Sequence, residues 1–232
     1  MSGLPSALRL ERFRIVPDPG HPFEVVDRVD EVRARRTAER KARGLGPPPF
    51  IKPELLLVHY AVTHNIDMTY AAQVARGYYA TLSIDGYSDG LRSRMKVIQQ
   101  TQFNEYASHA GESKWNGRSS VSMWSVGIEI ANPGPLVRGT DGQLRTVYGK
   151  VWPEDDAEEH PIAPGYPPQW THWAKYSPEE IAIVVTVGLL LKEHGLIRDV
   201  VGHSDVAPKR KYDPGPAFPM QYVRQSIFRE AA

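Results

Sequence analysis

Two short apolar runs constrain the fold of this chain more than any other feature of its sequence. Residues 55–59 (LLLVH) are apolar up to a terminal histidine, and residues 125–130 (SVGIEI) form a second run with one acidic side chain. Short runs without polar alternation are typical of strands that are buried on both faces of a sheet. The chain is therefore expected to form an α/β domain, with the end of the first strand opening onto a site.

Helix signals support this arrangement. One helix is predicted over about residues 68–76. A second begins after Ser177, where the sequence SPEE forms a capping box with proline at the first helical position, and it runs to about His194 before Gly195. A further strand is predicted at residues 199–201. Strands joined by helices in this order indicate a domain built on a mixed β-sheet.

Two stretches between these elements are less regular. Residues 79–107 are predicted to form short strands around the turn signals Asp85-Gly86 and Asp89-Gly90. Residues 132–176 show little periodicity and contain seven prolines and several Tyr and Trp residues. The aromatic content favours an ordered loop on the domain, whose rings either wall a groove or only pack the loop down.

The N-terminal residues differ in character from the rest. Gly44, Gly46 and the prolines at 47–49 interrupt any helix or central strand, so we expect residues 1–50 to be a charged N-terminal extension and residues 51–232 to be the main domain. The extension contains a predicted helix with six cations. This helix has either a solvated charged face or a basic face for an anionic polymer or lipid. The cations are Arg33, Arg35, Arg36, Arg40, Lys41 and Arg43.

Composition excludes several classes of function. The formal net charge of the 232 residues is only +1, which argues against nucleic-acid binding driven by overall charge. The chain has no cysteine, so disulfides, thiolate metal sites and a cysteine nucleophile are excluded, and His, Asp and Glu remain as metal ligands. We expect no nucleic-acid partner.

Neither a signal peptide nor a membrane span is predicted. The N-terminal residues lack an apolar core of signal-peptide length, and the longest apolar stretch, residues 181–191, is about half a span and contains Thr186 and Gly188. We expect synthesis in the cytoplasm without a signal peptide and no integral membrane segment. The oligomeric state is not predicted.

The segment that carries most chemistry is residues 202–218, GHSDVAPKRKYDPGPAF. Its prolines and glycines predict a rigid loop that holds polar side chains in place after a strand. With His59 at the end of an earlier strand, His203 and Asp213 could supply the three protein ligands that a zinc hydrolase needs. His64 and Asp205 lie near these positions and are alternative ligands.

This segment resembles the C-terminal signature of the zinc-dependent N-acetylmuramoyl-L-alanine amidases of the AmpD type, which include phage lysis amidases and are related to the peptidoglycan recognition proteins. Three other segments agree in order: LLLVHY ending after His59, FNEYASHAG over residues 103–111, and SVGIEIANPGPL over residues 125–136. The resemblance covers roughly residues 54–220. It implies a mixed β-sheet flanked by helices, with a zinc site at one end of the sheet.

The resemblance also implies residue roles. His59, His203 and Asp213 would bind one Zn²⁺ per chain, and Glu129 and Lys211 would flank the reacting water and the substrate carbonyl. Zinc makes water a better nucleophile and polarises a carbonyl. Glu129 would move the proton, and Lys211 would stabilise the developing oxyanion.

Substrate contacts are predicted at three further residues. His109, Trp115 and Arg118 are expected to line the groove, because aromatic faces suit sugars and a guanidinium can hold a carboxylate. The chain departs from the family where Tyr79-Ala80-Thr81 replaces a common Ser-Ala-His and where Ser108 replaces a tryptophan. These changes affect substrate contacts but leave the metal ligands intact.

The expected function is hydrolysis of the amide bond between N-acetylmuramic acid and L-alanine in bacterial peptidoglycan. The partner would be peptidoglycan or a muropeptide, and the role would be cell-wall lysis, as in an endolysin, or wall recycling, with action on the wall after release or delivery. Two alternatives are a non-catalytic peptidoglycan-recognition protein on the same fold and an endopeptidase that cuts within the stem peptide.

Overall fold

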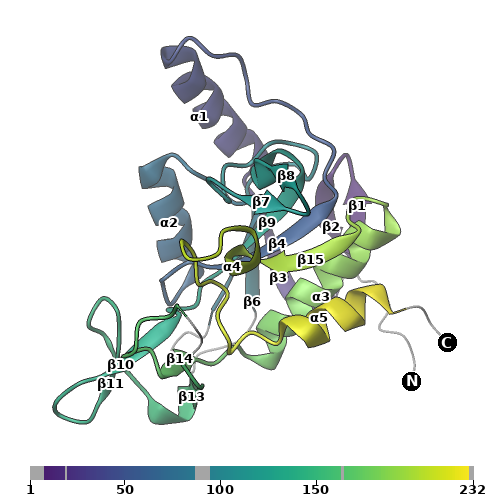
Figure 1. The fold of residues 1–232 in the computed structure, drawn as a ribbon. Helices are drawn as coiled ribbons and strands as arrows, with labels where there is room; N and C mark the ends of the chain where they lie inside the picture. Colours follow the sequence, from purple (N-terminus) through teal and green to yellow (C-terminus); the bar gives the residue numbers. More distant parts are fainter. Residues whose placement is uncertain (1–7, 19, 87–94, 163–164, 230–232) are drawn as a thin grey trace.

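A six-stranded mixed sheet forms the centre of the molecule (Figure 1). The computed structural model describes residues 8–18, 20–86, 95–162 and 165–229. Across the sheet the strand order is β15 (Asp199–Gly202), β4 (Leu55–Tyr60), β9 (Ser125–Ile130), β5 (Leu82–Ile84), β6 (Met95–Gln99) and β3 (Phe23–Asp27). All neighbouring pairs are parallel except β5 with β6. This arrangement confirms the predicted α/β fold with a mixed sheet.

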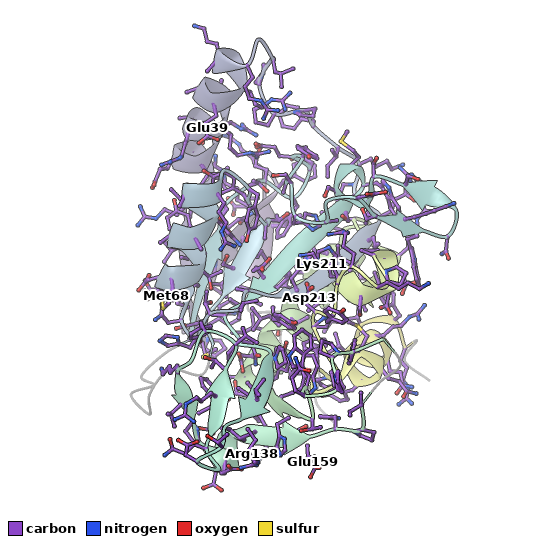
Figure 2. The ribbon with its side chains drawn as sticks, turned by 60° about the vertical axis from the view of Figure 1, so that its left-hand side comes forward. Glu39, Met68, Arg138, Glu159, Lys211 and Asp213 are labelled. Carbon is purple, nitrogen blue, oxygen red and sulfur yellow. The ribbon has the colours of Figure 1, made fainter. Side chains whose placement is uncertain are left out.

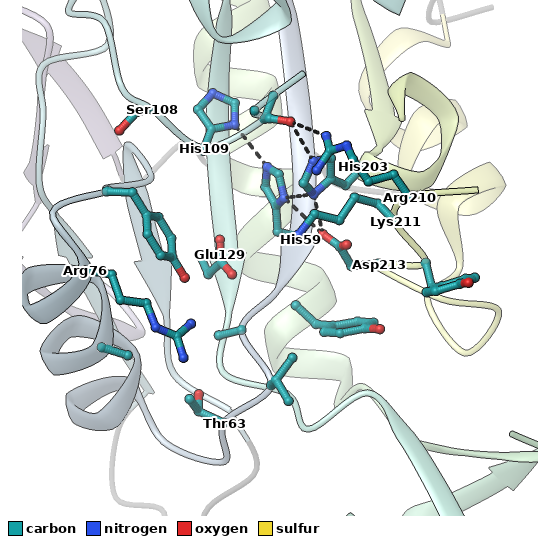
Figure 3. Close-up of a pocket in the computed structure, with 18 of the residues that line it drawn as sticks. His59, Thr63, Arg76, Ser108, His109, Glu129, His203, Arg210, Lys211 and Asp213 are labelled. Carbon is teal, nitrogen blue, oxygen red and sulfur yellow. Dashed lines mark hydrogen bonds and ion pairs between the residues drawn. The ribbon is translucent and has the colours of Figure 1, made fainter. Parts of the chain in front are cut away.

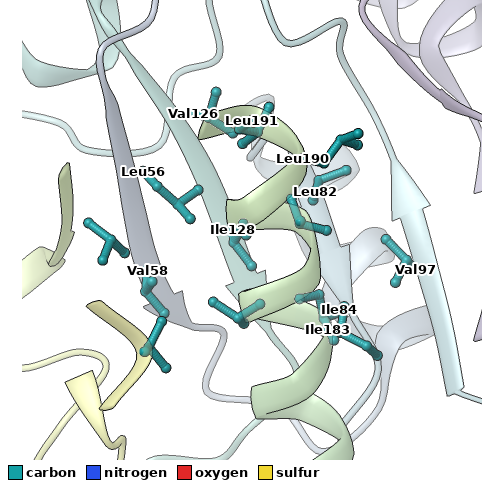
Figure 4. Packing of buried hydrophobic residues seen from close by; sticks show 14 of the residues in the cluster. Leu56, Val58, Leu82, Ile84, Val97, Val126, Ile128, Ile183, Leu190 and Leu191 are labelled. Atoms are coloured by element: carbon teal, nitrogen blue, oxygen red, sulfur yellow. The ribbon is translucent and has the colours of Figure 1, made fainter. Parts of the chain in front are cut away.

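The two apolar runs of the sequence are the central strands β4 and β9, and both are buried along nearly their whole length. Alternate residues of a strand point to opposite faces. Leu56 and Val58 pack with Val126 and Ile128 in the main core (Figure 4). His59 and Glu129 belong to the other set and are direct neighbours across the β4–β9 pair. The strand register therefore places both polar side chains on the face opposite the main core.

Two helices cover the core face. Helix α3 (Pro178–Glu193) begins with the predicted capping box between Ser177 and Glu180, and α5 (Met220–Phe228) packs beside it (Figure 1). At Gly188 of α3 a Cβ would lie 2.3 Å from the Ile227 side chain, so the two helices can approach this closely only with glycine there. These contacts fix the apolar side of the sheet.

Helix α2 (Ile66–Arg76) and helix α1 (Val29–Ala42) lie side by side (Figure 1), and the Tyr70 hydroxyl of α2 donates to Glu31 of α1. Asn65 caps α2 by accepting a hydrogen bond from the backbone of Met68. Helix α2 contacts β5 and β6, and it borders the region in front of His59 and Glu129. The predicted helix over about residues 68–76 is thus confirmed.

The N-terminal residues are more closely integrated than an extension would be. After the hairpin of β1 (Leu8–Glu11) and β2 (Arg14–Pro17), strand β3 forms an edge of the central sheet. The buried Arg36 of α1 pairs with the buried Glu105, which Arg33 also contacts. Of the six cations, Arg36 is therefore internal and Arg33 is half-buried in the same ion-pair cluster, so the helix does not present a uniform basic face.

Residues 135–174 include a second sheet rather than only an irregular loop. This five-stranded antiparallel sheet contains β12 (Val151–Trp152), β11 (Leu144–Thr146), β10 (Pro135–Arg138), β14 (His172–Ala174) and β13 (Ala157–Glu159). Its strands are two to four residues long, too short for a visible period of two in the sequence. Figure 2 shows Arg138 and Glu159 of this sheet at one end of the molecule, away from Lys211 and Asp213.

The remaining elements are short. They are β7 (Lys114–Trp115), β8 (Arg118–Ser119), α4 (His203–Val206) and the 3₁₀ turns Val121–Met123 and Glu154–Asp156. The one turn of helix in α4 falls within the segment expected to be a loop. The predicted turn at Asp89-Gly90 lies outside the described residues. In the described part of the chain, no helix combines the length and the apolar character that a bilayer span requires.

Candidate metal centre

The centre begins with the strand ends. His59 is the fifth residue of β4, and Glu129 is its register partner on β9. Both are buried, with exposed fractions of 2% and 8%. The parallel pairing of β4 with β15 brings the end of β15 beside them, so that His203, directly after β15, joins the same sheet edge. Side chains from three strands that are distant in sequence thus lie together at one edge of the sheet.

The loop after β15 supplies the third ligand candidate. The backbone N–H of Ser204 donates to the carbonyl oxygen of Asp213 at 2.8 Å, which ties the two ends of the loop together. Gly202 permits this closure, because a Cβ there would lie 2.6 Å from the ring of Pro214. Asp213 is therefore held beside His203 by backbone contacts, as the rigid-loop prediction requires.

Three donor atoms converge at this point (Figure 3). His59 Nδ1 lies 2.8 Å from His203 Nδ1, and the Oδ2 atom of Asp213 lies 3.0 Å and 2.9 Å from these two nitrogens. Among the described residues, these three form the group of His, Asp and Glu side chains able to hold a metal ion. The alternatives have other partners, since Asp205 accepts from the Gly202 backbone and His64 contacts the Tyr148 hydroxyl.

The hydrogen bond of His203 with the Ala110 backbone shows which ring nitrogen of His203 carries the proton. His203 Nε2 lies 3.0 Å from the carbonyl oxygen of Ala110, which can only accept a hydrogen bond, so Nε2 carries the proton. A neutral imidazole carries its proton on one nitrogen only. The Nδ1 atom of His203 therefore presents a lone pair to the other two donor atoms.

A series of hydrogen bonds through Ser125 and His109 shows which ring nitrogen of His59 carries the proton. Ser125 donates to the carbonyl oxygen of Val121 at 2.7 Å, so its oxygen accepts from His109 Nε2 at 3.2 Å. His109 Nδ1 is then left with a lone pair, which accepts a hydrogen bond from the N–H of His59 Nε2 at 3.0 Å. His59 Nδ1 thus also presents a lone pair. Ser125 and His109 act as outer partners that orient the ring of a ligand candidate.

The ionisation of these groups agrees with this assignment. Burial, and next the nearby His203, lower the pKa of His59 to about 4, so its ring is neutral near pH 7. Burial alone would raise the pKa of Asp213, but the contacts with His203 and His59 outweigh it and hold that pKa below its usual range. Asp213 is therefore ionised.

The lone pairs of His59 Nδ1 and His203 Nδ1 and the Oδ2 atom of Asp213 lie within 3.0 Å of one another, an arrangement suited to binding one cation between them. The protons of the two neutral rings are already on His59 Nε2 and His203 Nε2. One additional proton between the three facing atoms could not form hydrogen bonds along all three contacts. Two imidazoles and a carboxylate match the protein ligands of catalytic zinc sites, which keep a further position open. The residues present therefore fit a zinc ion.

Two further charged groups flank the donor atoms. Burial, and next the negative charge of Asp213, raise the pKa of Glu129 well above its usual value, while Lys211 opposes this shift. A carboxylate with a raised pKa is suited to accept a proton near neutral pH. Lys211 lies beside His59 and Asp213 (Figure 3) and is half-buried.

All five of these residues line one cavity of about 880 Å³. Its walls come from α2, from the turn between β11 and β12, and from the loop after β15. Val147 and Tyr148 of the small sheet are among the lining residues, as expected if part of residues 132–176 walls a groove.

The three predicted substrate contacts differ in position. His109 borders the cavity but is only 7% exposed, behind His59. Trp115 and Arg118 are not among the described residues that line the cavity. Arg118 instead pairs with Glu54 at 3.0 Å and stacks on Trp124, because the β7–β8 hairpin directs it there. The structure thus does not bring these two side chains to the cavity.

Two contributions to the site were not predicted from the sequence. Ser125 had no signal, because a serine at the start of a buried strand is common. Met68, Ala72 and Arg76 line the cavity from α2, and their spacing of four residues is a signal that helix periodicity could have supplied.

The fold and this centre define an α/β domain with a candidate metal site at one end of its central sheet. Residues 49–216 match the sequence profile of the N-acetylmuramoyl-L-alanine amidase family, and the chain belongs to that family.

Relatives agree with this assignment. The chain is 24% identical over 174 residues to the N-acetylmuramoyl-L-alanine amidase AmiD of Escherichia coli, covering 74% of this chain and 52% of AmiD. It is 30% identical over 128 residues to the 1,6-anhydro-N-acetylmuramyl-L-alanine amidase AmpD of Enterobacter cloacae, covering 55% of this chain and 49% of AmpD. The chain thus spans about half the length of these curated relatives.

Solved structures share the fold. The structure of E. coli AmiD, in complex with the substrate anhydro-N-acetylmuramic acid-L-Ala-D-γ-Glu-L-Lys, superposes with a TM-score of 0.55 at 23% identity. The comparison covers 77% of this chain and 58% of AmiD. AmpDH3 of Pseudomonas aeruginosa, in complex with an anhydromuramic pentapeptide, gives a TM-score of 0.54 at 22% identity, over 77% of this chain and 61% of AmpDH3.

Proposed function

We propose that this protein hydrolyses the amide bond between the lactyl group of N-acetylmuramic acid and the L-alanine of a peptidoglycan stem peptide. Family membership supports the proposal. So does the named activity of the relatives AmiD and AmpD, and the bound muramyl peptide in the AmiD structure. The observation that carries it is the convergence of His59, His203 and Asp213 beside Glu129 and Lys211 in one cavity.

One zinc ion held by His59, His203 and Asp213 would activate water and polarise the scissile carbonyl. Because the ligand nitrogens and Asp213 are held by their outer contacts, little rearrangement is needed to bind the ion. Ser125 and His109 would keep the lone pair of His59 available to the ion.

Glu129 would transfer a proton from the attacking water to the leaving amine. It takes a proton from the attacking water as the new C–O bond forms, and it gives this proton to the nitrogen of L-alanine as the C–N bond breaks. The products are the free carboxyl group of the muramyl lactyl arm and a peptide with a free N-terminal amine. The raised pKa of Glu129 makes both transfers easier near neutral pH.

Lys211 would stabilise the negative charge that develops on the carbonyl oxygen. It lies in the same cavity, two residues before Asp213 in the loop after β15. A fixed cation aimed at a developing charge in a partly closed site contributes more than it would in water.

The test measures metal content and products together. We expect one zinc per chain, loss of turnover with chelator, and recovery on zinc addition. Mass spectrometry should find peptides that begin with L-Ala and carry no sugar. His59→Ala should lose both zinc and activity, whereas Glu129→Gln should keep zinc and lose about 10²–10⁴-fold in kcat. His160→Ala, outside the cavity lining, is the control.

Other results would contradict the proposal. Full activity of Glu129→Gln would remove this residue from the chemistry. Binding of cell walls without product release would instead indicate a recognition protein, and products cut within the peptide would indicate an endopeptidase. Activity on intact sacculi compared with small soluble muropeptides separates a lysis role, as in an endolysin, from a recycling role.

A further inference from the structure

One face of α2 forms a wall of the cavity. Met68, Ala72 and Arg76 are four residues apart and all line it. Residues with this spacing lie on one helix face, and the stripe from Met68 to Arg76 extends about 12 Å. Figure 3 shows the Arg76 side chain extending from the helix into the cavity on the side of Glu129. The stripe is apolar except for this guanidinium.

Arg76 has no acidic partner among the described residues. Among the residues that the structure describes, no ion pair to a carboxylate involves Arg76, whereas Arg33, Arg36 and Arg118 each pair with a glutamate. Arg76 is exposed at the C-terminal end of α2. Burial, and next the charge of Glu129, raise the pKa of Tyr78, and a hydrogen bond with the nearby Arg76 guanidinium opposes this shift.

The other two cations that line the cavity already have roles. Arg210 donates to the backbone carbonyl oxygens of Ala110 and Glu112, at 2.7 Å and 2.5 Å. Lys211 lies beside the candidate metal ligands. Among the described cations that line the cavity, Arg76 is thus the one that remains for an anionic group of a ligand.

The proposed substrate carries such a group. In a stem peptide that begins L-Ala-D-γ-Glu, the glutamate continues the chain through its side-chain carboxyl, so its α-carboxylate stays free. This carboxylate belongs to the residue directly after L-Ala, one residue beyond the scissile nitrogen. A guanidinium can bind a carboxylate through two parallel hydrogen bonds, which gives both affinity and orientation.

We propose that Arg76 binds the free α-carboxylate of the γ-linked glutamate and thereby makes the enzyme selective for acidic stem peptides. This inference rests on the proposed amidase function. It assigns the peptide side of the substrate to the α2 wall of the cavity, and the sugar side to the opposite part.

The test uses two substrates that differ at one group: a muramyl-L-Ala-D-γ-Glu peptide with a free α-carboxylate, and the same compound with an α-carboxamide. The wild-type protein should prefer the carboxylate in kcat/KM by about tenfold to a hundredfold. Arg76→Gln should lose this preference, mainly through a higher KM for the carboxylate, and should change little on the carboxamide. Arg76→Lys should restore part of it.

Arg43→Gln is the matched control, since Arg43 is an exposed arginine outside the cavity lining. It should keep the wild-type preference. Zinc content and melting temperature should be unchanged in all three variants, which excludes a loss of fold. An equal effect of Arg76→Gln on both substrates, or no preference in the wild-type protein, would overturn the inference.

Binding separates this inference from the proposed reaction. Calorimetry with the Glu129→Gln variant should show tighter binding of the carboxylate compound than of the carboxamide, and adding Arg76→Gln should abolish the difference. If the wild-type protein cleaves neither compound but this binding difference is present, the reaction is wrong and the Arg76 site is right. If cleavage occurs without the binding difference, the Arg76 site is wrong.

Discussion

His109 shows how one residue can serve a site without facing the ligand. Its ring lies against Gly127 of β9, where a Cβ would be only 2.5 Å from the imidazole. The absence of a side chain at Gly127 therefore makes room for His109, and His109 in turn contacts His59 at 3.0 Å. The sequence marked His109 as a functional residue, but only the packing shows that it stands behind a ligand candidate.

Ser125→Ala tests this arrangement. Without the hydroxyl, His109 Nε2 loses its acceptor, and the proton assignment that leaves a lone pair on His59 Nδ1 is no longer fixed. Loss of an outer partner of a metal ligand costs about tenfold to a hundredfold in affinity. Zinc affinity, measured by competition with a chelator, should fall by about tenfold while the far-UV spectrum is unchanged.

Ser119→Ala on β8 is the control, because Ser119 is exposed and outside the cavity lining. Equal zinc affinity in the Ser125→Ala variant and the wild-type protein would show that His59 is oriented by packing alone.

At the scale of helices and strands, elements with a strong local sequence signal were predicted from the sequence, and elements with a weak signal were not. The capping box at Ser177 and the apolar runs of β4 and β9 identified α3 and the central strands with nearly the observed bounds. Strand β3 gave no such signal, because only its first residue is fully buried at the sheet edge. Its place depends on pairing with β6, about 70 residues away, which no local pattern reveals.

The contact of α1 with the domain predicts a stability effect. Arg36 is 5% exposed and pairs at 2.8 Å with Glu105, which is 1% exposed. Removing one partner of a buried ion pair leaves the other charge inadequately compensated, at a cost of about 3 kcal/mol. Arg36→Met should therefore lower the free energy of unfolding by about 3 kcal/mol in urea denaturation.

Arg35→Met is the matched control, since the pair of Arg35 with Glu39 is exposed and should contribute about 0.5 kcal/mol or less. Equal small effects of the two substitutions would show that α1 is only loosely attached, as expected for a separate extension.

At the scale of the whole molecule, the candidate centre exists only in the folded chain. His59 is 144 residues from His203 and 154 residues from Asp213, and the parallel order β15-β4-β9 brings them together. The resemblance of four ordered motifs predicted this ligand set. The cavity walls from α2 and the small sheet follow from tertiary packing, which the sequence alone did not supply.

Burying His59 also makes the stability of the metal-free protein depend on pH. The pKa of His59 falls from 6.5 in the unfolded chain to about 4 in the folded protein, through burial and then the nearby His203. Between these values protons bind the unfolded chain but not the folded one, so acid favours unfolding. The contribution is fully present above pH 6.5 and is lost as the pH falls toward about 4.

We therefore expect the free energy of unfolding, measured in urea with chelator present, to decrease between about pH 7 and about pH 4.5, with roughly 2–3 kcal/mol of the decrease due to His59. His59→Gln should remove that part of the decrease, whatever its effect on stability near neutral pH. His160→Gln, which alters a half-buried histidine outside the cavity, should keep the wild-type dependence. If His59→Gln follows the same pH curve as the wild-type protein, His59 is not held neutral by the fold, and the lone pair assigned to its Nδ1 atom loses its support.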